Sequence, residues 1–365
     1  MTTRPVRHSI PADILALSHE RDELRKRGHY DRADALKKRI EEAGYGIKDN
    51  PRGAHLIILP SVEVNDTFYR MARQVPSQLN EHDTCMFSVL LLTNNRSDEA
   101  HRCVNSILRH AGSMAIEVIL IDNASQDDLT TWTREIQQEA AFLHVIRISR
   151  TMGEAEAYNL GLKQSRGRFI LQLDPSLELT GDIFTPLARQ LEQAEVGLTG
   201  LHGLRTDDLR HFEERAPEDN PTDNADEDAS GSSAQDLLAS AEVEAITGTC
   251  LAFRRKLLKK IGLYDEGYRF PFFMDIDFSF TARDAGARAI VTPALPIIHH
   301  PVESELSLPD AERSRLTKRN FYRFLEKWGD REDLLLDGQT DDEDEYADED
   351  DENEDEEDFA NEEDA

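Results

Sequence analysis

Two carboxylates stand two residues apart inside an aromatic run of the chain. Asp275 and Asp277 lie in the stretch FPFFMDIDFSFTARDAGAR, residues 270–288. A buried carboxylate is costly unless it is paired or put to use, so this pair needs a physical reason. One reason is chemical, namely a catalytic base beside an acid that orients the substrate. The structural alternatives are the start of a helix and the edge of a surface strand.

Polar residues also follow three predicted strands at the point where each strand ends. The run FSVLLLT leads into residues 93–96 (TNNR), IEVILID leads to Asp122 and Asn123, and RFILQLD leads into residues 174–176 (DPS). In a parallel sheet the carboxyl ends of the strands meet at one edge, and ligands bind beyond that edge. The sequence therefore predicts a binding site there.

Strands and helices alternate along the chain from Phe87 onward. Continuous apolar strands are joined by predicted helices of about 10–15 residues, a pattern typical of a parallel sheet with helices on both faces. We therefore expect an α/β domain over residues 87–335, interrupted by an acidic insertion at 216–236.

Two segments are predicted to be disordered, because they carry many like charges and little that could be buried. The insertion at 216–236 has seven acidic residues and no basic one. Within the C-terminal tail (336–365), residues 341–365 have 18 acidic residues and no basic one, out of a formal net charge of -31. Such a tail competes with phosphate, which argues against nonspecific nucleic-acid binding by the whole chain.

Residues 1–59 are predicted to form a small separate module, followed by a connecting segment at 60–86. Apolar residues at helical spacing predict two helices within 11–43, and a turn and a short strand follow. The run ERDELRKRGHYDRADALKKRIEEAGYGIKDNPRG resembles the C-terminal module of cysteinyl-tRNA synthetases, which lies at the end that contacts the tRNA anticodon. The resemblance implies an RNA contact. The alternative is a generic helical hairpin used for packing or for binding a protein partner.

Four runs occur in one order along the chain, and together they resemble the family 2 glycosyltransferases, in particular the rhamnosyltransferase-like branch. They are VLLLTNNR, VILIDNASQDD, TMGEAEAYNLG with GRFILQLDPSLEL, and TGTCLAFRR with GLYDEGYRFPFFMDIDFSFTARDAG and IIHHP. The resemblance covers residues 87–303 and implies the GT-A fold, a Rossmann-like, mostly parallel sheet with helices on both faces. It also implies transfer of a sugar from a UDP- or dTDP-linked donor to an acceptor hydroxyl, with inversion.

The resemblance places the donor's nucleotide at the first two strand ends. Asp122 would accept a hydrogen bond from the uracil or thymine imide, although the run DNAS is also good turn chemistry. Thr93, Asn95 and Arg96 would contact the base, ribose or phosphate. Asn123 would lie beside them.

Two glycines also belong to the donor site that the resemblance implies. Gly153 would allow close backbone approach at a helix N-terminus, which suits an anion; the alternative is an ordinary helix start. Gly248 would give backbone access at the turn that leads into the strand TCLAFR.

The resemblance further implies a divalent cation, Mg²⁺ or Mn²⁺, that bridges the diphosphate of the donor. Such hard cations prefer oxygen ligands, and Asp174 stands at the position of the metal-binding acid. Ser176 replaces the second acid of the family pattern, so metal dependence is weakened or lost unless Asp174 and water suffice. His299 and His300 stand where the family has a late histidine that reaches the metal or the diphosphate.

Asp275 falls on the position of the family's catalytic base, which removes a proton from the acceptor hydroxyl as it attacks. Asp277 would face the same side if the segment is extended, and would then help to position the acceptor. The alternative for Asp277 is the N-cap of the helix FSFTARDAG. Met274 replaces a neighbouring acid, so nothing adjacent in sequence raises the pKa of Asp275 by like charge.

A rival hypothesis is a catalytically weak nucleotide-sugar-binding or scaffold protein on the same frame, with an RNA- or protein-binding N-terminal module. Ser176 and the acidic segments motivate it. The three cysteines show no paired spacing and the chain has no apolar run of membrane-spanning length. We therefore expect a cytoplasmic protein, and the sequence leaves peripheral attachment to a membrane open. The acceptor, a glycan, a lipid-linked glycan or a small molecule, is not predicted.

Overall fold

The computed structural model describes residues 10–50, 53–139, 142–215, 241–268, 272–292, 294–300 and 310–336. The predicted acidic insertion at 216–236 and the predicted tail beyond residue 336 lie outside these residues. Within the described ranges, no helix combines the length and the apolar character that a membrane span requires.

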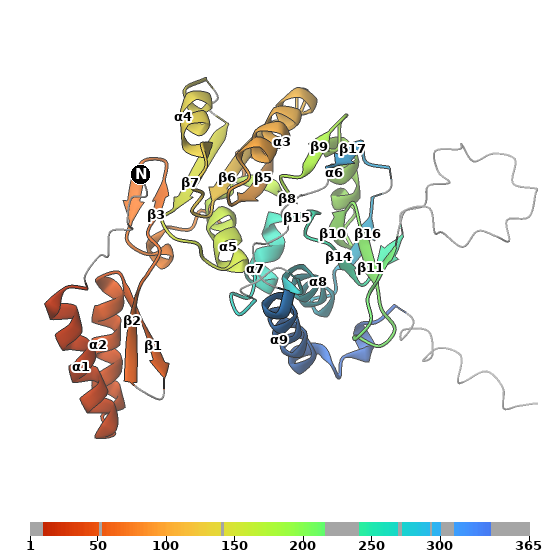
Figure 1. Ribbon diagram of the computed structural model, residues 1–365. Coiled ribbons are helices and arrows are strands. Elements are labelled where there is room, and N and C mark those ends of the chain that lie inside the picture. The colour runs from red at the N-terminus through yellow and green to blue at the C-terminus, as the bar shows by residue number, and fades with distance from the viewer. Residues whose placement is uncertain are drawn as a thin grey trace, which may run out of the picture.

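The main element of the described chain is a ten-stranded sheet (Figure 1). Its strands lie in the order β13 (Glu242–Val243), β16 (Arg288–Val291), β10 (Val196–Gly200), β15 (Cys250–Arg254), β8 (Gly167–Leu173), β5 (Cys85–Thr93), β6 (Ile116–Asp122), β7 (Leu143–Ile148), β3 (Val62–Val64) and β4 (Thr67–Tyr69). The central strands β8, β5, β6 and β7 pair in parallel, which confirms the predicted α/β class. Flanking strands such as β15 and β3 run antiparallel to them.

Helices cover both faces of the sheet, as the alternation of elements predicts (Figure 1). One face carries α3 (Ser97–His110), α4 (Leu129–Glu139) and α6 (Phe184–Glu192), which share a core with Leu91 and Leu120 of the sheet. The other face carries α5 (Glu154–Gln164), α7 (Leu258–Ile261) and α8 (Met274–Asp284), which share a core with Leu90 and Ile121. Successive residues of β5 and β6 thus enter opposite cores, and this explains why both runs are continuously apolar.

Shorter elements complete the domain. They are β9 (Leu177–Leu179) paired with β17 (Ile297–His299), a small sheet of β12 (Glu213–Arg215), β11 (Gly203–Arg205) and β14 (Ala245–Ile246), and the helical elements η2 (Arg255–Leu257), α9 (Asp310–Trp328) and η3 (Glu332–Leu334). Helix α9 packs against α8 through aromatic side chains, with the rings of Phe280 and Phe324 5.2 Å apart at a nearly perpendicular angle. This contact fixes the position of α8, which carries Asp275.

The N-terminal residues form a unit with a small core of its own (Figure 1). It contains α1 (Ala12–Lys26), α2 (Tyr30–Glu42), β1 (Tyr45–Asn50) and β2 (Gly53–Ile58). The two predicted helices are present, but the strands form an antiparallel hairpin where the sequence suggested a single short strand. The buried guanidinium of Arg21 donates to both carboxylate oxygens of Asp49, at 2.5 and 2.8 Å, and so joins α1 to the hairpin.

The segment at 60–86, expected to be a connection, contributes structure to the sheet. Strand β3 extends the sheet beyond β7, and η1 (Ala72–Gln74) follows β4. Further along the segment, the buried guanidinium of Arg255 donates to the carbonyl oxygens of Gln78 and Glu81, at 3.1 and 2.7 Å, and to that of Ser165 at 3.0 Å. A buried arginine with these partners attaches the segment to the end of α5.

We predict that Arg255→Met lowers the free energy of unfolding by about 2–4 kcal/mol, because three backbone carbonyls lose a buried charged donor. Urea unfolding measures this change, and limited proteolysis should show faster cleavage between residues 75 and 84. Lys256→Met is the matched control, since Lys256 is exposed, and it should change stability by less than about 0.5 kcal/mol. Equal stability of the two variants would contradict the anchoring role of Arg255.

Candidate functional site

The ends of β6, β5 and β8 meet at one edge of the sheet, as the sequence predicts. Thr93 at the end of β5 is in register with Asp122 at the end of β6. Asp174 follows β8 directly, and its amide donates to the carbonyl of Thr249 at 2.8 Å. Since β15 runs antiparallel to β8, the residues before β15 lie at the same edge. We call residues 93–96, 122–123, 174–176 and 247–249 together the strand-end edge.

Asp174 is bound on the strand-end edge by Arg96 and Ser176. Arg96 donates from Nη2 to Oδ1 at 2.8 Å and from Nη1 to Oδ2 at 3.2 Å. Ser176 donates to Oδ1 from its amide at 2.8 Å and from its hydroxyl at 2.6 Å. Burial alone would raise the pKa of Asp174, but these hydrogen bonds hold the pKa below its ordinary value. Asp174 is therefore a satisfied carboxylate, and Arg96 is also paired with Glu99.

The residues predicted to hold a divalent ion are not assembled into a site. Among the described residues, no group of three or more His, Cys, Asp or Glu side chains is arranged to hold a metal ion. The amide of His300 donates to the carbonyl of Ser176, but its ring Nε2 lies 2.7 Å from Glu178 Oε2. His299 is exposed. With both oxygens of Asp174 already accepting hydrogen bonds, this donor set does not fit a divalent ion as it stands.

The pairing of β17 with β9 places His299 and His300 beside residues 176–178, and a role for them at the metal or the diphosphate stays a prediction. Opposite His299 in this register lies Leu177, and His300 follows at the end of β17. The ring of His300 contacts the carboxylate of Glu178 on β9. Sequence spacing could not show this, because the two strands are more than 100 residues apart in the chain.

Asp275 lies in the first turn of α8 and reaches the strand-end edge through Gly248. The Gly248 amide donates to Asp275 Oδ2 at 2.6 Å, and the Ile276 amide donates to Oδ1 at 3.0 Å. Burial raises the pKa of Asp275 above its ordinary value, and these amide bonds act in the opposite direction. A Cβ on Gly248 would lie 2.7 Å from Gln172 Nε2 and 3.3 Å from Asp275 Oδ2. Glycine is therefore required here by close approach.

Asp277 does not accompany Asp275, and the expectation of an extended segment is wrong. Both residues lie in a helix, so their side chains leave it in different directions. Asp277 is buried, and its Oδ1 accepts from Trp328 Nε1 at 2.8 Å, from Lys327 Nζ at 2.9 Å and from the Tyr268 hydroxyl at 3.3 Å. These contacts hold α9 against α8, which gives Asp277 a structural role.

Glu154 is a candidate site residue that the sequence analysis missed. It is the first residue of α5, directly after Gly153, which caps the helix as predicted. Burial, helped by the charges of Asp174 and Asp275, raises the pKa of Glu154 to about 7, while Arg96 opposes the shift. The pair of acids in TMGEAEAY was a visible signal, but a helix normally places acids in its first turn for structural reasons. An acid at this helix start also disfavours an anion beside Gly153.

At the ends of β5 and β6, the side chains of Thr93 and Asp122 are buried. One oxygen of Asp122 accepts from the amide of Ser125 at 2.8 Å. This is the turn interaction that the run DNAS predicts as the alternative to a donor contact. The hydroxyl of Thr93 has no hydrogen-bond partner within the part of the chain that the structure describes. A donor contact by Asp122 stays a prediction.

Asn95 and Asn123 hold loops together. The side-chain amide of Asn123 donates to the carbonyl of Met152 at 3.0 Å, and its oxygen accepts from the Met152 amide at 2.9 Å. Asn95 has a positive φ of 54° and accepts from the amide of Gln126 at 2.7 Å. These bonds join the strand ends to α5 and to each other. The expected donor contacts of both residues find no support in these arrangements, because their side chains are already occupied.

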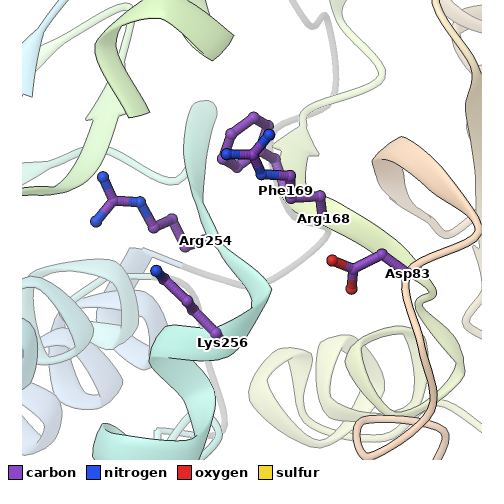
Figure 2. Close-up of a pocket in the computed structure, with 5 residues that line it drawn as sticks. All are labelled: Asp83, Arg168, Phe169, Arg254 and Lys256. Atoms are coloured by element: carbon purple, nitrogen blue, oxygen red, sulfur yellow. The ribbon is translucent and has the colours of Figure 1, made fainter. Parts of the chain in front are cut away.

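A cavity of about 110 Å³ lies at the opposite end of β8 from Asp174 (Figure 2). It is lined by Asp83, Arg168, Phe169, Arg254 and Lys256. Figure 2 shows Arg254 and Lys256 extending from one segment, across from Arg168 and Phe169. The guanidinium of Arg254 donates to backbone carbonyls at the C-terminal end of α6, at 2.7 Å to Leu191 in its last turn and 3.0 Å to Ala194 just after it. The cavity is well below the 300–1,000 Å³ of typical ligand sites, and it contains no predicted site residue.

The central part of the chain matches a known protein family. Residues 88–262 match the family described as Glycosyl transferase family 2. The chain is 22% identical over 251 residues to the uncharacterised protein y4gI of Sinorhizobium fredii (strain NBRC 101917 / NGR234), covering 67% of this chain. It spans only 28% of the length of that relative.

One solved structure has a similar fold, and a second gives a weaker superposition. The crystal structure of GalNAc-T7 with UDP, GalNAc and Mn²⁺ superimposes with a TM-score of 0.56 at 18% identity, over 68% of this chain and 50% of that chain. The mannosyltransferase PcManGT of Pyrobaculum calidifontis, solved with GDP-Man and Mn²⁺, reaches a TM-score of 0.46 at 16% identity, over 70% of this chain and 69% of that one. The likeness to GalNAc-T7 agrees with the predicted GT-A fold. The resemblance of residues 1–59 to a cysteinyl-tRNA synthetase module stays a prediction.

We predict that Asp277→Ala acts on stability. Removing the carboxylate leaves Lys327 and the indole N–H of Trp328 without their acceptor, which should cost about 2–4 kcal/mol of unfolding free energy. Thermal and urea unfolding measure the loss. Asp284→Ala on the same helix removes an exposed pair with Arg331 and should cost less than about 1 kcal/mol. An Asp277→Ala protein of full stability that loses activity would restore the acceptor-positioning role.

We also predict that Mn²⁺ binds the nucleotide-free protein weakly, because Arg96 and Ser176 occupy both oxygens of Asp174. Arg96→Met keeps much of the side-chain stem, removes the competing charge, and should tighten Mn²⁺ binding at least about tenfold, or about 1.4 kcal/mol. Isothermal calorimetry measures both affinities. Arg96→Met combined with Asp174→Asn is the control and should remove the gain. Tight binding to the unaltered protein would contradict the prediction.

Proposed function

We propose that the glycosyl transferase family 2 domain at residues 88–262, together with the following α8, transfers a sugar from a nucleoside-diphosphate donor to an acceptor hydroxyl. One observation carries the proposal: the strand-end edge holds Asp174 and Asp275 through adjacent residues. Asp174 bonds to Thr249, and Gly248 bonds to Asp275. A carboxylate that suits a base therefore lies beside the strand end where open α/β sheets bind ligands.

In this proposal Asp275 is the general base. The acceptor hydroxyl attacks the anomeric carbon, its proton passes to Asp275, and the bond from that carbon to the diphosphate breaks, so the diphosphate leaves with the electron pair. A single displacement of this kind inverts the anomeric centre. The raised pKa of Asp275 suits the role, since a base works best when its pKa is nearer the working pH.

The donor end is proposed at Arg96 and Asp122. Arg96 is a fixed cation on the strand-end edge, and its planar guanidinium suits phosphate oxygens. Asp122 would accept from a uracil or thymine imide, which makes UDP- and dTDP-sugars the first donors to test. GalNAc-T7, whose structure contains UDP, supports this choice by fold likeness alone. No step in the proposal passes through a metal, because the residues present do not fit one.

The alternative is a nucleotide-sugar-binding protein without transfer. The occupied Asp174 and the serine at position 176 favour it, since they weaken any metal-assisted departure of the diphosphate. Calorimetry with UDP- and dTDP-sugars, followed by a nucleotide-release assay with a panel of acceptors, separates the two functions. Binding without release favours the alternative, and absence of binding removes both. The chain spans about half of GalNAc-T7 and 28% of y4gI. Because neither relative is covered over its full length, the acceptor is identified by the panel and not by comparison.

We predict that Asp275→Asn lowers kcat at least about 100-fold, because the acceptor proton loses its destination, while donor affinity stays within about threefold. In the unaltered enzyme the rate should fall as the pH drops through the raised pKa of Asp275, above the ordinary aspartate value of 3.8. The pH dependence of kcat/KM checks the sign. Asp284→Asn, on the exposed side of the same helix, is the matched control. Unchanged turnover in Asp275→Asn would remove Asp275 from the mechanism.

A further inference from the structure

Two polar side chains pair with each other deep inside the core below the strand-end edge. The hydroxyl of Tyr264 donates to Gln172 Oε1 at 2.8 Å, and both residues are buried. Gln172 comes from β8, two residues before Asp174, within the otherwise apolar run FILQL. A buried polar pair in such a place is costly unless every group is satisfied. The remaining partners of the pair therefore matter.

The side-chain NH₂ group of Gln172 is linked through Gly248 to Asp275, the candidate base. Its Nε2 donates to the carbonyl of Gly248 at 2.8 Å, and the amide of Gly248 donates to Asp275 Oδ2 at 2.6 Å. Four residues thus form one hydrogen-bonded chain, Tyr264 to Gln172 to Gly248 to Asp275. The absence of room for a side chain at Gly248 is part of the same arrangement, because a Cβ would strike Gln172 Nε2.

The far end of this chain is held as firmly as the near end. Asn159 of α5 accepts from the Tyr264 amide at 3.0 Å and donates to the Tyr264 carbonyl at 2.9 Å. The Tyr264 ring also packs on Phe278 of α8, with ring centres 4.6 Å apart. Tyr264 therefore contacts the helix that carries Asp275, and it is linked through Gln172 to the turn that binds Asp275.

We infer that Tyr264 and Gln172 are positioning residues that orient the carboxylate of Asp275 through the peptide groups of Gly248. A core that needed only filling would use apolar side chains at both places, since apolar isosteres avoid the desolvation of a hydroxyl and an amide. The polar chain ends on Asp275. Asp275 and Gly248 are half-buried, whereas Tyr264 and Gln172 are fully buried. The inference rests on the proposed role of Asp275 in transfer.

The first test needs no substrate and uses the full chain. Gly181, Gly200 and Gly248 are the three glycines that follow a threonine, so ¹³C-carbonyl threonine with ¹⁵N-glycine gives three selected amide signals. The signal that changes in Asp275→Asn belongs to Gly248. Its shift should titrate with Asp275, because the amide donates to that carboxylate. Tyr264→Phe removes the hydroxyl of the pair and Gln172→Met removes the amide, and each keeps most of the side-chain volume.

In both variants the Gly248 signal should move, and its titration midpoint should rise. A hydrogen bond to the charged form lowers a carboxyl pKa, so a misplaced amide stabilises the carboxylate less. Tyr268→Phe is the matched control, since it removes a buried hydroxyl that faces Asp277 on the same helix, and it should leave the Gly248 signal unchanged. An unchanged signal and midpoint in both test variants would overturn the inference.

The second test uses turnover with the donor found by the nucleotide-release panel. We expect kcat to fall about tenfold in each variant, which is modest beside the roughly 100-fold effect of a 1 Å misplacement, with KM for the donor within about twofold. The acid limb of the rate profile should move to higher pH. The double variant should be no slower than the slower single variant, because both act through one chain.

The outcomes distinguish a failure of the positioning role of Tyr264 and Gln172 from a failure of the proposed function. Full additivity of the two substitutions, with an unmoved acid limb, would mark Tyr264 and Gln172 as ordinary core residues and overturn the inference alone. An unaltered protein that binds no donor and releases no nucleotide would overturn the proposed function, while the Gly248 titration still decides whether the chain controls Asp275.

Discussion

The hydrogen-bonded register of β6, β5 and β8 is the constraint on which the rest of the molecule depends. These strands are buried on both faces, so their sequences are largely apolar. Ser88, Glu117 and Gln172 are buried polar exceptions, and further polar side chains gather where the strands end. A slip of one residue would exchange the faces of a strand and remove Asp122 from Thr93. The register therefore determines both the core and the place where chemistry is allowed. The antiparallel strand β15 begins at the same edge, and the residues before it bring Thr249 to Asp174 and Gly248 to Asp275.

Charge balance at this edge is the second constraint. Arg96 faces Asp174 and Glu99, and Glu154 and Asp275 lie close enough for their charges to interact with this group. An anionic diphosphate at this edge would compete with Asp174 and Glu99 for the guanidinium of Arg96. As the pH rises through about 7, Glu154 becomes charged, and the edge becomes less favourable to an anion. The neutral hydroxyl of Ser176 donates to Asp174, whereas a carboxylate at this position would add repulsion to the group.

The sequence was sufficient for the α/β class and for the edge that collects polar residues, because both follow from local apolar periodicity. It was insufficient for β3 and β4, which are three residues long and gain their pairing from β7. Side-chain directions were also beyond it, since His300 and Asn123 turn according to partners remote in the chain. Gln172 and Tyr264 were invisible for a different reason. Gln172 stands within an apolar strand, Tyr264 stands in a loop, and the two are 92 residues apart in the chain.

The two carboxylates of the MDID run show how local backbone decides chemistry. Phe272 and Phe273 both have positive φ, 81° and 70°, which is unfavourable for bulky residues. Aromatic packing offsets this cost, with the ring of Phe273 5.5 Å from Phe324. The turn starts α8 at Met274, so Asp275 and Asp277 are separated by about 200° around a helix and do not share a strand face. Asp277 then binds α9, and Asp275 binds Gly248. The contact of Asp277 with α9 orients α8, the helix that presents Asp275 to Gly248.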